Sequence, residues 1–199
     1  MYHGLWVYNV KDTDLKYKEM DDASNNEISL PDYIDHGLKI LSVGLNPSMP
    51  SAQLGFYFAN PRNRFWKAFN QAGVIGVEVT PTKNIHQQLL EKYGIGFTDV
   101  AKRASSMGHE LRAADFKRDA PVLREKIERY RPELIWFHGK VAMSKFMYYS
   151  YGVRQDWQWG FNSIDAMRSR VFISPNPSPA NAAYSLDVLV GYYKKLKSR

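Results

Sequence analysis

The 199-residue sequence contains no cysteine. This absence excludes both a disulfide framework and a thiolate metal site, and it is compatible with a reducing compartment. Long apolar runs are missing too: none approaches the ~20 residues of a membrane-spanning helix, and residues 1–4 lack the basic start and apolar core of a signal peptide. We therefore expect a soluble, cytoplasmic protein without a membrane partner.

The histidines lack the spacing of metal ligands. They lie at positions 3, 36, 86, 109 and 138, with no H-x-x-x-H pair and no accompanying carboxylate pair. Gly94 and Gly96 lack the third glycine of a dinucleotide-binding fingerprint. We expect neither a metal nor another cofactor.

Acidic residues are scarce outside the first 35 positions. Residues 1–35 have a net charge of −5, whereas residues 36–199 carry 24 basic and 12 acidic side chains. A body this basic favours a polyanion as partner, bound through salt-sensitive phosphate contacts. A solvated basic surface with no partner would give the same composition, so charge alone leaves both interpretations open.

Short apolar runs alternate with helical patterns along the chain. Strands are expected at 39–43, 134–137 and 170–173, with a strand or loop at 97–100, and helices at 63–73, 83–93, 114–130, 140–149 and 184–197. This alternation predicts an α/β fold: a three-layer α/β/α sandwich with a mainly parallel central sheet of about four strands. We expect residues 31–199 to form one domain and residues 1–30 an acidic appendage, in which residues 5–8 could be a short edge strand.

The loop after the first predicted strand holds one amide in a constrained setting. Pro47 biases Asn46 away from helical backbone angles, and Gly44 permits a close approach of the backbone. Polar loops at the carboxyl ends of strands are where open α/β sheets bind ligands. An amide held in this way can orient a water molecule, although Asn-Pro is also an ordinary turn initiator.

This loop and the motifs that follow resemble the mismatch-specific uracil/thymine DNA glycosylases, a branch of the uracil-DNA glycosylase superfamily. The motifs are GLNPS at 44–48, GFYFANP at 55–61, NRFW at 63–66, YGIGFTD at 93–99, ERYRP at 128–132, HGK at 138–140, QWG at 158–160 and PNPS at 175–178. They follow the family's order and cover about residues 32–197. The resemblance implies a monofunctional enzyme that hydrolyses the N-glycosidic bond of uracil, and of thymine or other damaged bases, in mismatched duplex DNA.

The resemblance also implies roles for single residues. Asn46 would position the hydrolytic water, Phe58 would stack on the everted base, and the backbone around Leu45 and Phe58 would bind its polar edge. Ser51 and Asn176 would be further base-binding residues; Asn176 stands where more distant relatives have a histidine that contacts the base.

Ser48 and Asp99 are candidates whose roles the motifs leave open. Ser48 occupies the place of a bulky tyrosine in strictly uracil-selective relatives, so the pocket should tolerate larger bases, unless Ser48 only completes a turn. Asp99 falls where the family varies. If its side chain faces the pocket, it could activate the water or stabilise the cationic transition state; otherwise it would cap the loop or pair with Lys102 or Arg103.

The second motif departs from the family pattern at its wedge. Ser178, Pro179, Ala180 and Asn181 would contact DNA, but Ala180 stands where many relatives have a leucine that fills the hole left by the base. The segment resembles the hypoxanthine-acting branch instead, so a hypoxanthine-preferring glycosylase remains an alternative. A catalytically idle DNA-binding module is another. We expect a monomer that needs only DNA with a mismatched or damaged base.

Overall fold

The computed structural model describes residues 28–197. Within this range a five-stranded sheet has the order β2-β1-β3-β5-β4. Its strands are β1 (Ile40–Gly44), β2 (Ile95–Asp99), β3 (Leu134–His138), β4 (Gly160–Asn162) and β5 (Arg170–Ser174). β1 pairs in parallel with β2 and β3, and β3 with β5, whereas β4 is antiparallel to β5. The predicted α/β class with a mainly parallel sheet is confirmed.

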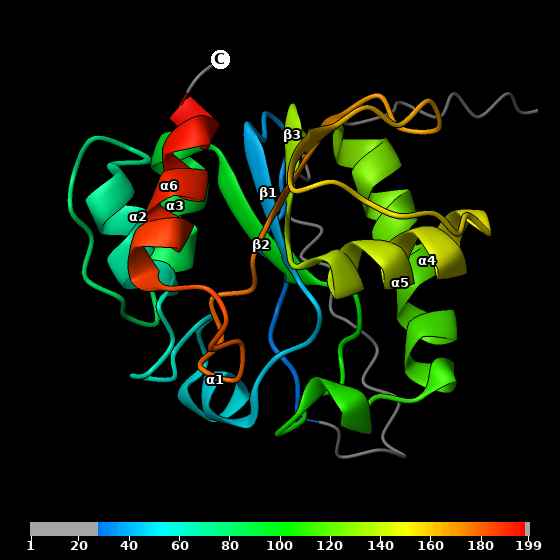
Figure 1. The fold of residues 1–199 in the computed structure, drawn as a ribbon, viewed down its shortest axis with the longest axis horizontal. Helices are drawn as coiled ribbons and strands as arrows, with labels where there is room; N and C mark the ends of the chain where they lie inside the picture. The colour runs from blue at the N-terminus through cyan, green and yellow to red at the C-terminus, as the bar shows by residue number, and fades with distance from the viewer. Residues whose placement is uncertain (1–27, 198–199) are drawn as a thin grey trace, which may run out of the picture.

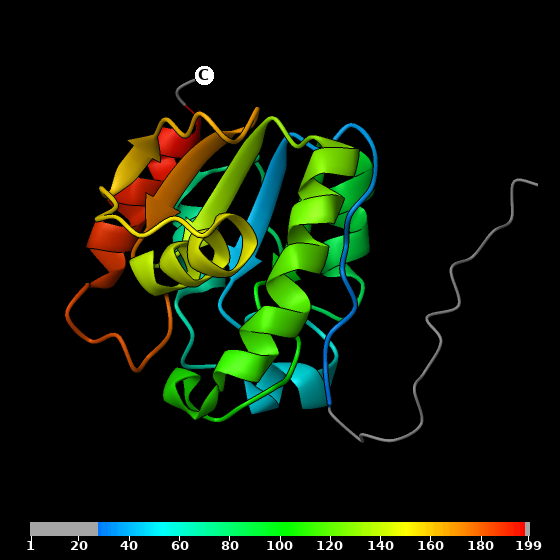
Figure 2. The same cartoon turned by 90° about the vertical axis from the view of Figure 1, so that its right-hand side faces the viewer.

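Helices cover both faces of the sheet (Figures 1 and 2). One face carries α2 (Phe65–Ala72), α3 (Ile85–Tyr93) and α6 (Leu186–Lys194), and the other carries α4 (Ala113–Tyr130) and α5 (Lys140–Tyr151). Alternate side chains of β3 belong to two separate apolar cores: Leu134 and Trp136 pack on one side, Ile135 and Phe137 on the other. This explains why the strand is apolar from Leu134 to Phe137, since successive side chains point to opposite faces.

Most helix boundaries fall within two residues of their predicted positions. α2 and α3 end as expected at glycines in the left-handed region, Gly73 with φ 60° and Gly94 with φ 65°. α2 begins at Phe65 with Arg64 as its N-cap, and the side chain of the preceding residue, Asn63, accepts the Phe65 N–H at 2.9 Å. α4 runs unbroken through Pro121.

Two short elements were not predicted. α1 (Met49–Leu54) begins after Ser48, whose Oγ accepts the Ser51 N–H, and ends at Gly55. Its sequence carries start and stop signals, a serine followed by a proline and then a glycine, but six residues are too few to show helical periodicity. β4 has only three residues, so the sheet has one strand more than the four expected.

The edge strand predicted at 5–8 lies outside the described residues, as does most of the predicted appendage. The described chain opens with residues 28–30, of which Leu30 is buried in the core. No helix in the range 28–197 has the length and apolar character needed to cross a lipid bilayer. Two 3-10 turns, Gly108–Glu110 and Lys195–Lys197, complete the described elements.

Candidate active site

Polar side chains lie at or just after the carboxyl ends of the four parallel strands, along the edge of the sheet where these strands end. Asp99 and His138 are the last residues of β2 and β3, and Asn46 and Asn176 follow the ends of β1 and β5. The strand order changes direction between β1 and β3, because the chain goes from β1 to β2 on one side and then to β3 on the other. Open α/β sheets bind ligands in the crevice at such a point. α1 and the loop after β5 lie beside this edge in both views (Figures 1 and 2).

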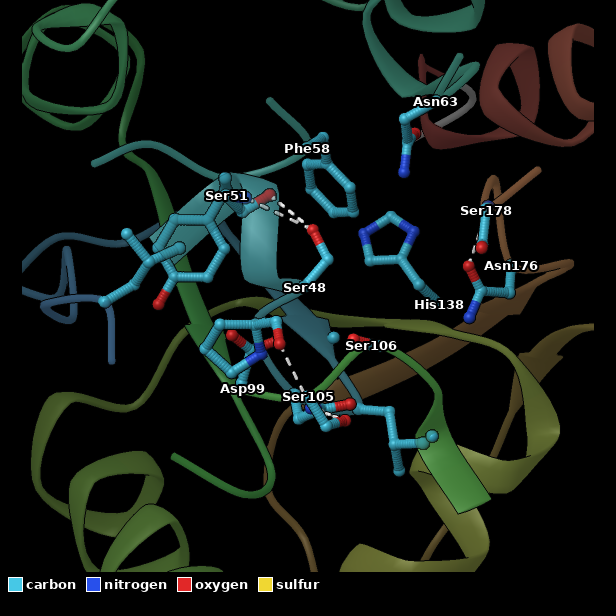
Figure 3. Close-up of a pocket in the computed structure, with 17 residues that line it drawn as sticks. Ser48, Ser51, Phe58, Asn63, Asp99, Ser105, Ser106, His138, Asn176 and Ser178 are labelled. Carbon is cyan, nitrogen blue, oxygen red and sulfur yellow. Dashed lines mark hydrogen bonds between the residues drawn. The ribbon is translucent and has the colours of Figure 1, made fainter. Parts of the chain in front are cut away.

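A pocket of about 140 Å³ opens at this edge (Figure 3). This volume is several times the ~30 Å³ that one water molecule occupies in the liquid. The predicted site residues that line it are Leu45, Asn46, Ser48, Ser51, Phe58, Asp99, Asn176 and Ser178. Pro179, Ala180 and Asn181 lie in the adjoining loop and not in the pocket wall, and Ala180 is exposed. The structure therefore brings the proposed catalytic and base-binding residues together, while their roles stay predictions.

The Asn46 side chain is fixed by its amide nitrogen. Nδ2 lies 3.0 Å from the Pro47 carbonyl oxygen, 3.1 Å from the Arg103 carbonyl oxygen and 2.8 Å from Ser105 Oγ. All three contacts use the donor side of the amide. Oδ1, which accepts no hydrogen bond from the described residues, is left as an acceptor for a water molecule or a ligand.

Asp99 lies against Gly44 on the neighbouring strand. The two residues are register partners between β1 and β2, and a Cβ atom on residue 44 would stand 2.2 Å from Asp99 Oδ1. No side chain fits in that space without displacing the carboxyl group. The close approach expected at Gly44 is therefore real, and the group that approaches is the Asp99 carboxyl.

The Asp99 carboxyl group is buried and incompletely hydrogen-bonded. The residue is 3 % exposed, and Oδ2 has no hydrogen-bond partner among the described residues. Burial raises the pKa of Asp99 to about 7, although the Lys102 charge lowers this pKa and the Asp32 charge raises it further. A carboxyl group with a pKa near neutrality, placed in a pocket, is suited to accept a proton.

The cations that were alternative partners of Asp99 have other contacts. Lys102 Nζ bonds to the Asp32 carboxylate and lies 3.0 Å from Thr98 Oγ1. Arg103 Nη2 pairs with Asp115 Oδ2 at 2.9 Å. The interpretation of Asp99 as a partner in a simple ion pair is therefore not favoured.

Two serines connect the first turn of α1 to the aromatic segment. Ser48 Oγ donates to Ser51 Oγ at 3.0 Å, and Ser51 Oγ accepts the Ala59 N–H at 3.1 Å. This chain of hydrogen bonds holds the backbone beside Phe58 against α1. Ser48 thus caps a helix as well as lining the pocket, so both interpretations of this residue have a structural basis.

Phe58 presents an aromatic ring to the pocket in a strained backbone conformation. Its φ of 57° lies in the left-handed region, which costs a non-glycine residue about 1–3 kcal/mol. One face of the ring stacks on Phe65, with centroids 4.0 Å apart and planes inclined by 10°. The Phe58 ring points into the pocket beside His138 (Figure 3). A planar group entering the pocket can therefore meet the ring face opposite Phe65.

His138 lines the pocket, although it was not a predicted site residue. It is 2 % exposed, its Nε2 lies 2.8 Å from Ser42 Oγ, and its Nδ1 has no partner among the described residues. Burial lowers the pKa of His138 to about 3, so the ring is neutral at physiological pH.

The loop at 175–184 is attached to α2 through Arg64. The Arg64 guanidinium donates to the carbonyl oxygens of Pro177, Ser178, Asn181 and Tyr184, with Nη2 2.7 Å from Ser178 O and 2.9 Å from Asn181 O. The loop also has hydrogen bonds of its own: Asn176 Oδ1 accepts the Ser178 N–H at 2.9 Å. The predicted DNA-contacting residues thus occupy a defined loop.

Known proteins share this fold and sequence pattern. The profile of the Uracil DNA glycosylase superfamily matches residues 31–197. The chain belongs to this superfamily. The chain is similar to the solution NMR structure of a candidate uracil DNA glycosylase from Methanosarcina acetivorans. The TM-score is 0.56, the sequence identity is 22%, and the match covers 86% of this chain and 98% of that one. At this identity the likeness to the solved structure concerns the fold alone.

The uracil DNA glycosylase match confirms the resemblance at the level of the superfamily and includes every predicted site residue. Sequence reasoning missed two residues that shape the site. His138 stood in a motif of the resemblance but was counted only among scattered histidines, and Arg64 was read as part of a helix start. Both matter through contacts with residues about a hundred positions away, which no local pattern shows.

Proposed function

We propose that this protein is a monofunctional DNA glycosylase that removes uracil from mismatched duplex DNA, the first step of base excision repair. The observation that carries the proposal is the pairing of two polar groups at adjacent strand ends. The Asn46 amide is held by three contacts with Oδ1 unused, and the buried Asp99 carboxyl lies in the same pocket. Phe58 supplies an aromatic face beside them.

These groups are suited to hydrolysis. Asn46 Oδ1 accepts a hydrogen bond from a water molecule and orients it, and Asp99 takes the proton that the water loses. The water oxygen bonds to C1′ of the sugar as the bond to the base breaks, and the bonding electron pair leaves with the base. The base leaves as an anion and takes up a proton from the solvent, so the products are a free base and an abasic site. An amide cannot accept the proton itself, so its contribution is orientation.

Two features support a hydrolytic enzyme acting on everted bases. No lysine is among the described residues that line the pocket, so no side chain is placed to form an imine with the sugar. A base must leave the DNA stack to reach a pocket, where enzymes of this kind grip it by stacking and hydrogen bonds. The Phe58 ring and the basic composition of residues 36–199 suit that mode of binding.

We extend the proposal to bases larger than uracil, with thymine and other damaged bases as substrates. The small side chain of Ser48 supports this extension, because one methyl group in an apolar pocket is discriminated by only about 1–3 kcal/mol. The loop sequence at 177–182 favours hypoxanthine as an alternative preferred base. Excision from duplexes that differ only in the target base, with uracil, thymine, ethenocytosine or hypoxanthine, measures the preference directly.

The test of the proposal is excision from a uracil:guanine duplex, detected as alkali-labile sites. The parent protein should release uracil, and Asn46→Ala should keep DNA binding but lose at least ~10²-fold in rate, because a misplaced water costs about that much. Asn162→Ala is the matched control, since Asn162 lies in β4 and does not line the pocket. A parent that binds the duplex but releases no base would favour the idle binding module instead.

A further inference from the structure

The loop at 100–107, which follows β2, receives the amide of Asn46. The Arg103 carbonyl oxygen and Ser105 Oγ accept hydrogen bonds from Asn46 Nδ2 at 3.1 Å and 2.8 Å. The Ser105 N–H in turn donates to Pro47 O at 3.1 Å. The direction of Asn46 Oδ1 therefore depends on where this loop lies.

Helix α4 anchors the same loop through two carboxylates. The helix begins at the end of the molecule where α1 lies (Figures 1 and 2). Asp115, in its first turn, binds the Arg103 guanidinium with both oxygens: Nε lies 3.0 Å from Oδ1, and Nη2 lies 2.9 Å from Oδ2. Asp119, one turn later, accepts the Lys102 N–H through Oδ2 at 2.7 Å. Two adjacent loop residues are thus attached to one helix.

The pair between Asp115 and Arg103 has a fixed geometry. Asp115 is 5 % exposed, and its Oδ2 also accepts the Arg112 N–H at 2.7 Å. Arg103 Nη2 donates to Glu110 O at 2.7 Å as well. The hydrogen bond from Arg103 lowers the pKa of Asp115 against the opposing effect of burial, so the carboxyl group is ionised at neutral pH. A two-point pair between arginine and a carboxylate fixes orientation in addition to supplying energy.

We propose that Asp115 is a positioning residue for hydrolysis: its two hydrogen bonds with Arg103 fix the carbonyl group that holds the Asn46 amide. The inference rests on the proposed function, in which Asn46 Oδ1 orients the attacking water. Loss of the carboxylate removes the contact that fixes the Arg103 side chain, so its peptide group can shift relative to the strand ends. A reacting group displaced by an ångström can cost ~10²-fold in rate. We expect a smaller loss, because Pro47 and Ser105 still hold the amide.

The experiment is a double-mutant cycle between positions 115 and 46, measured as single-turnover excision of uracil opposite guanine at saturating protein. Asp115→Asn replaces one of the two acceptor oxygens by a donor group that faces the guanidinium. It should lower the rate about tenfold in the parent, without weaker binding of the duplex, since it removes a negative charge. In Asn46→Ala, whose amide is gone, the same change should lower the rate less than about twofold, because coupled residues lose their effect together.

A conservative variant and a control on the same helix accompany the cycle. Asp115→Glu keeps both carboxylate oxygens and should retain more activity than Asp115→Asn. Glu128→Gln should keep the parent rate in both backgrounds, since Glu128 pairs with Arg124 at 2.7 Å and does not line the pocket. If Asp115→Asn folds poorly, Arg103→Lys tests the same link, because lysine keeps the charge without the planar fork.

Hydrogen exchange of the Asn46 side-chain amide tests the link independently of activity. Its ¹H–¹⁵N signals are identified by their absence in Asn46→Ala. They should exchange with solvent faster in Asp115→Asn than in the parent, and unchanged exchange would overturn the inference.

The outcomes of the cycle separate the inference from the proposed function. An equal loss in both backgrounds would mean that Asp115 acts on the fold as a whole. That result, or no loss in the parent, overturns the inference, while an active parent leaves the proposed function standing. A parent that binds the duplex and releases no base overturns both.

Discussion

The pocket floor and the loop beside it are built in different ways. The floor, formed by Asn46, Asp99 and His138, stands at the ends of paired strands between the two apolar cores. The loop at 175–184 leaves the sheet after β5, and Arg64 joins it to α2: its side chain binds four carbonyl oxygens of the loop, and its backbone N–H bonds to Pro177 O at 3.1 Å. The geometry of the floor is therefore set by the paired strands, whereas the loop is held by local hydrogen bonds and by Arg64, whose side chain can be changed without touching the sheet.

Gly44→Ala should have the largest effect, because it disturbs the floor directly. The new Cβ would stand 2.2 Å from Asp99 Oδ1 and must displace the carboxyl group. We expect excision to fall at least ~10²-fold and the free energy of unfolding to fall by about 1–3 kcal/mol. Gly191→Ala is the control, since a Cβ added at residue 191 would have no neighbouring atom within 4 Å outside its own helix backbone. A Gly44→Ala variant with the parent's rate would show that the Asp99 position is unimportant.

The pH profile of excision tests Asp99 as the proton acceptor. With the pKa of Asp99 raised to about 7 by burial, the rate should rise with pH by up to ~tenfold per unit below pH 7 and level off above it. Asp99→Asn should remove this dependence and lower the rate most above pH 7. The exposed Asp187, changed to asparagine, serves as control. An unchanged profile in Asp99→Asn would assign the titration to another group.

The same pKa shift predicts an opposite effect on stability. The folded state keeps a proton on Asp99 up to a pKa of about 7, whereas the unfolded chain releases it near the ordinary value of 3.8. The free energy of unfolding should therefore fall as pH rises between these values. Asp99→Asn carries no charge, so its gain in melting temperature over the parent should be larger at pH 8 than at pH 4. A gain that does not change with pH would contradict the shift.

Arg64→Lys should change the loop and spare the floor. Lysine keeps the charge but lacks the planar fork that reaches several carbonyl oxygens at once. We expect the duplex to bind roughly tenfold more weakly, which is a loss of about 1.4 kcal/mol of binding free energy. The single-turnover rate at saturating protein should change less. Arg62→Lys, at an exposed neighbouring position, is the control. A large fall in the saturated rate with unchanged binding would mean that the loop and floor are not separable.

Ala180→Leu should have the smallest effect, and a selective one. Ala180 is exposed and too small to fill the space of an everted base, so little of the unstacking cost of a few kcal/mol is recovered. The parent should excise uracil opposite guanine and in single strands better than uracil opposite adenine. Leucine at this position should raise the rate most on the adenine-paired substrate. Equal changes on all three substrates would mean that residue 180 is not at the wedge position.

The sequence predicted the elements that have a local signature. The apolar runs gave β1, β3 and β5, and glycines in the left-handed region ended α2 and α3 where expected. α1 and β4 were missed because six and three residues are too short for a periodic pattern. For such segments, packing against the rest of the chain decides the structure.

The site was predictable where one stretch of chain builds it, and not where distant stretches meet. Asn46, Ser48 and Phe58 come from a single continuous segment. The environment of Asp99 depends on the approach of Gly44 from another strand, and the state of His138 depends on Ser42, 96 residues away. Burial and hydrogen bonding are properties of these tertiary contacts, and no spacing in the sequence records them.

The strained backbone at Phe58 has a consequence for the entropy of binding. Fixing a free side chain during binding costs about 0.5–1.5 kcal/mol. The φ of 57° sets the direction in which the Phe58 side chain leaves the backbone, and stacking on Phe65 restrains the ring itself, so this ordering cost is met when the protein folds. A base that enters the pocket meets a surface that has no rotamer left to lose. Because every base has a flat face, the saving is the same for each of them, and this surface favours capture of a base over choice among bases.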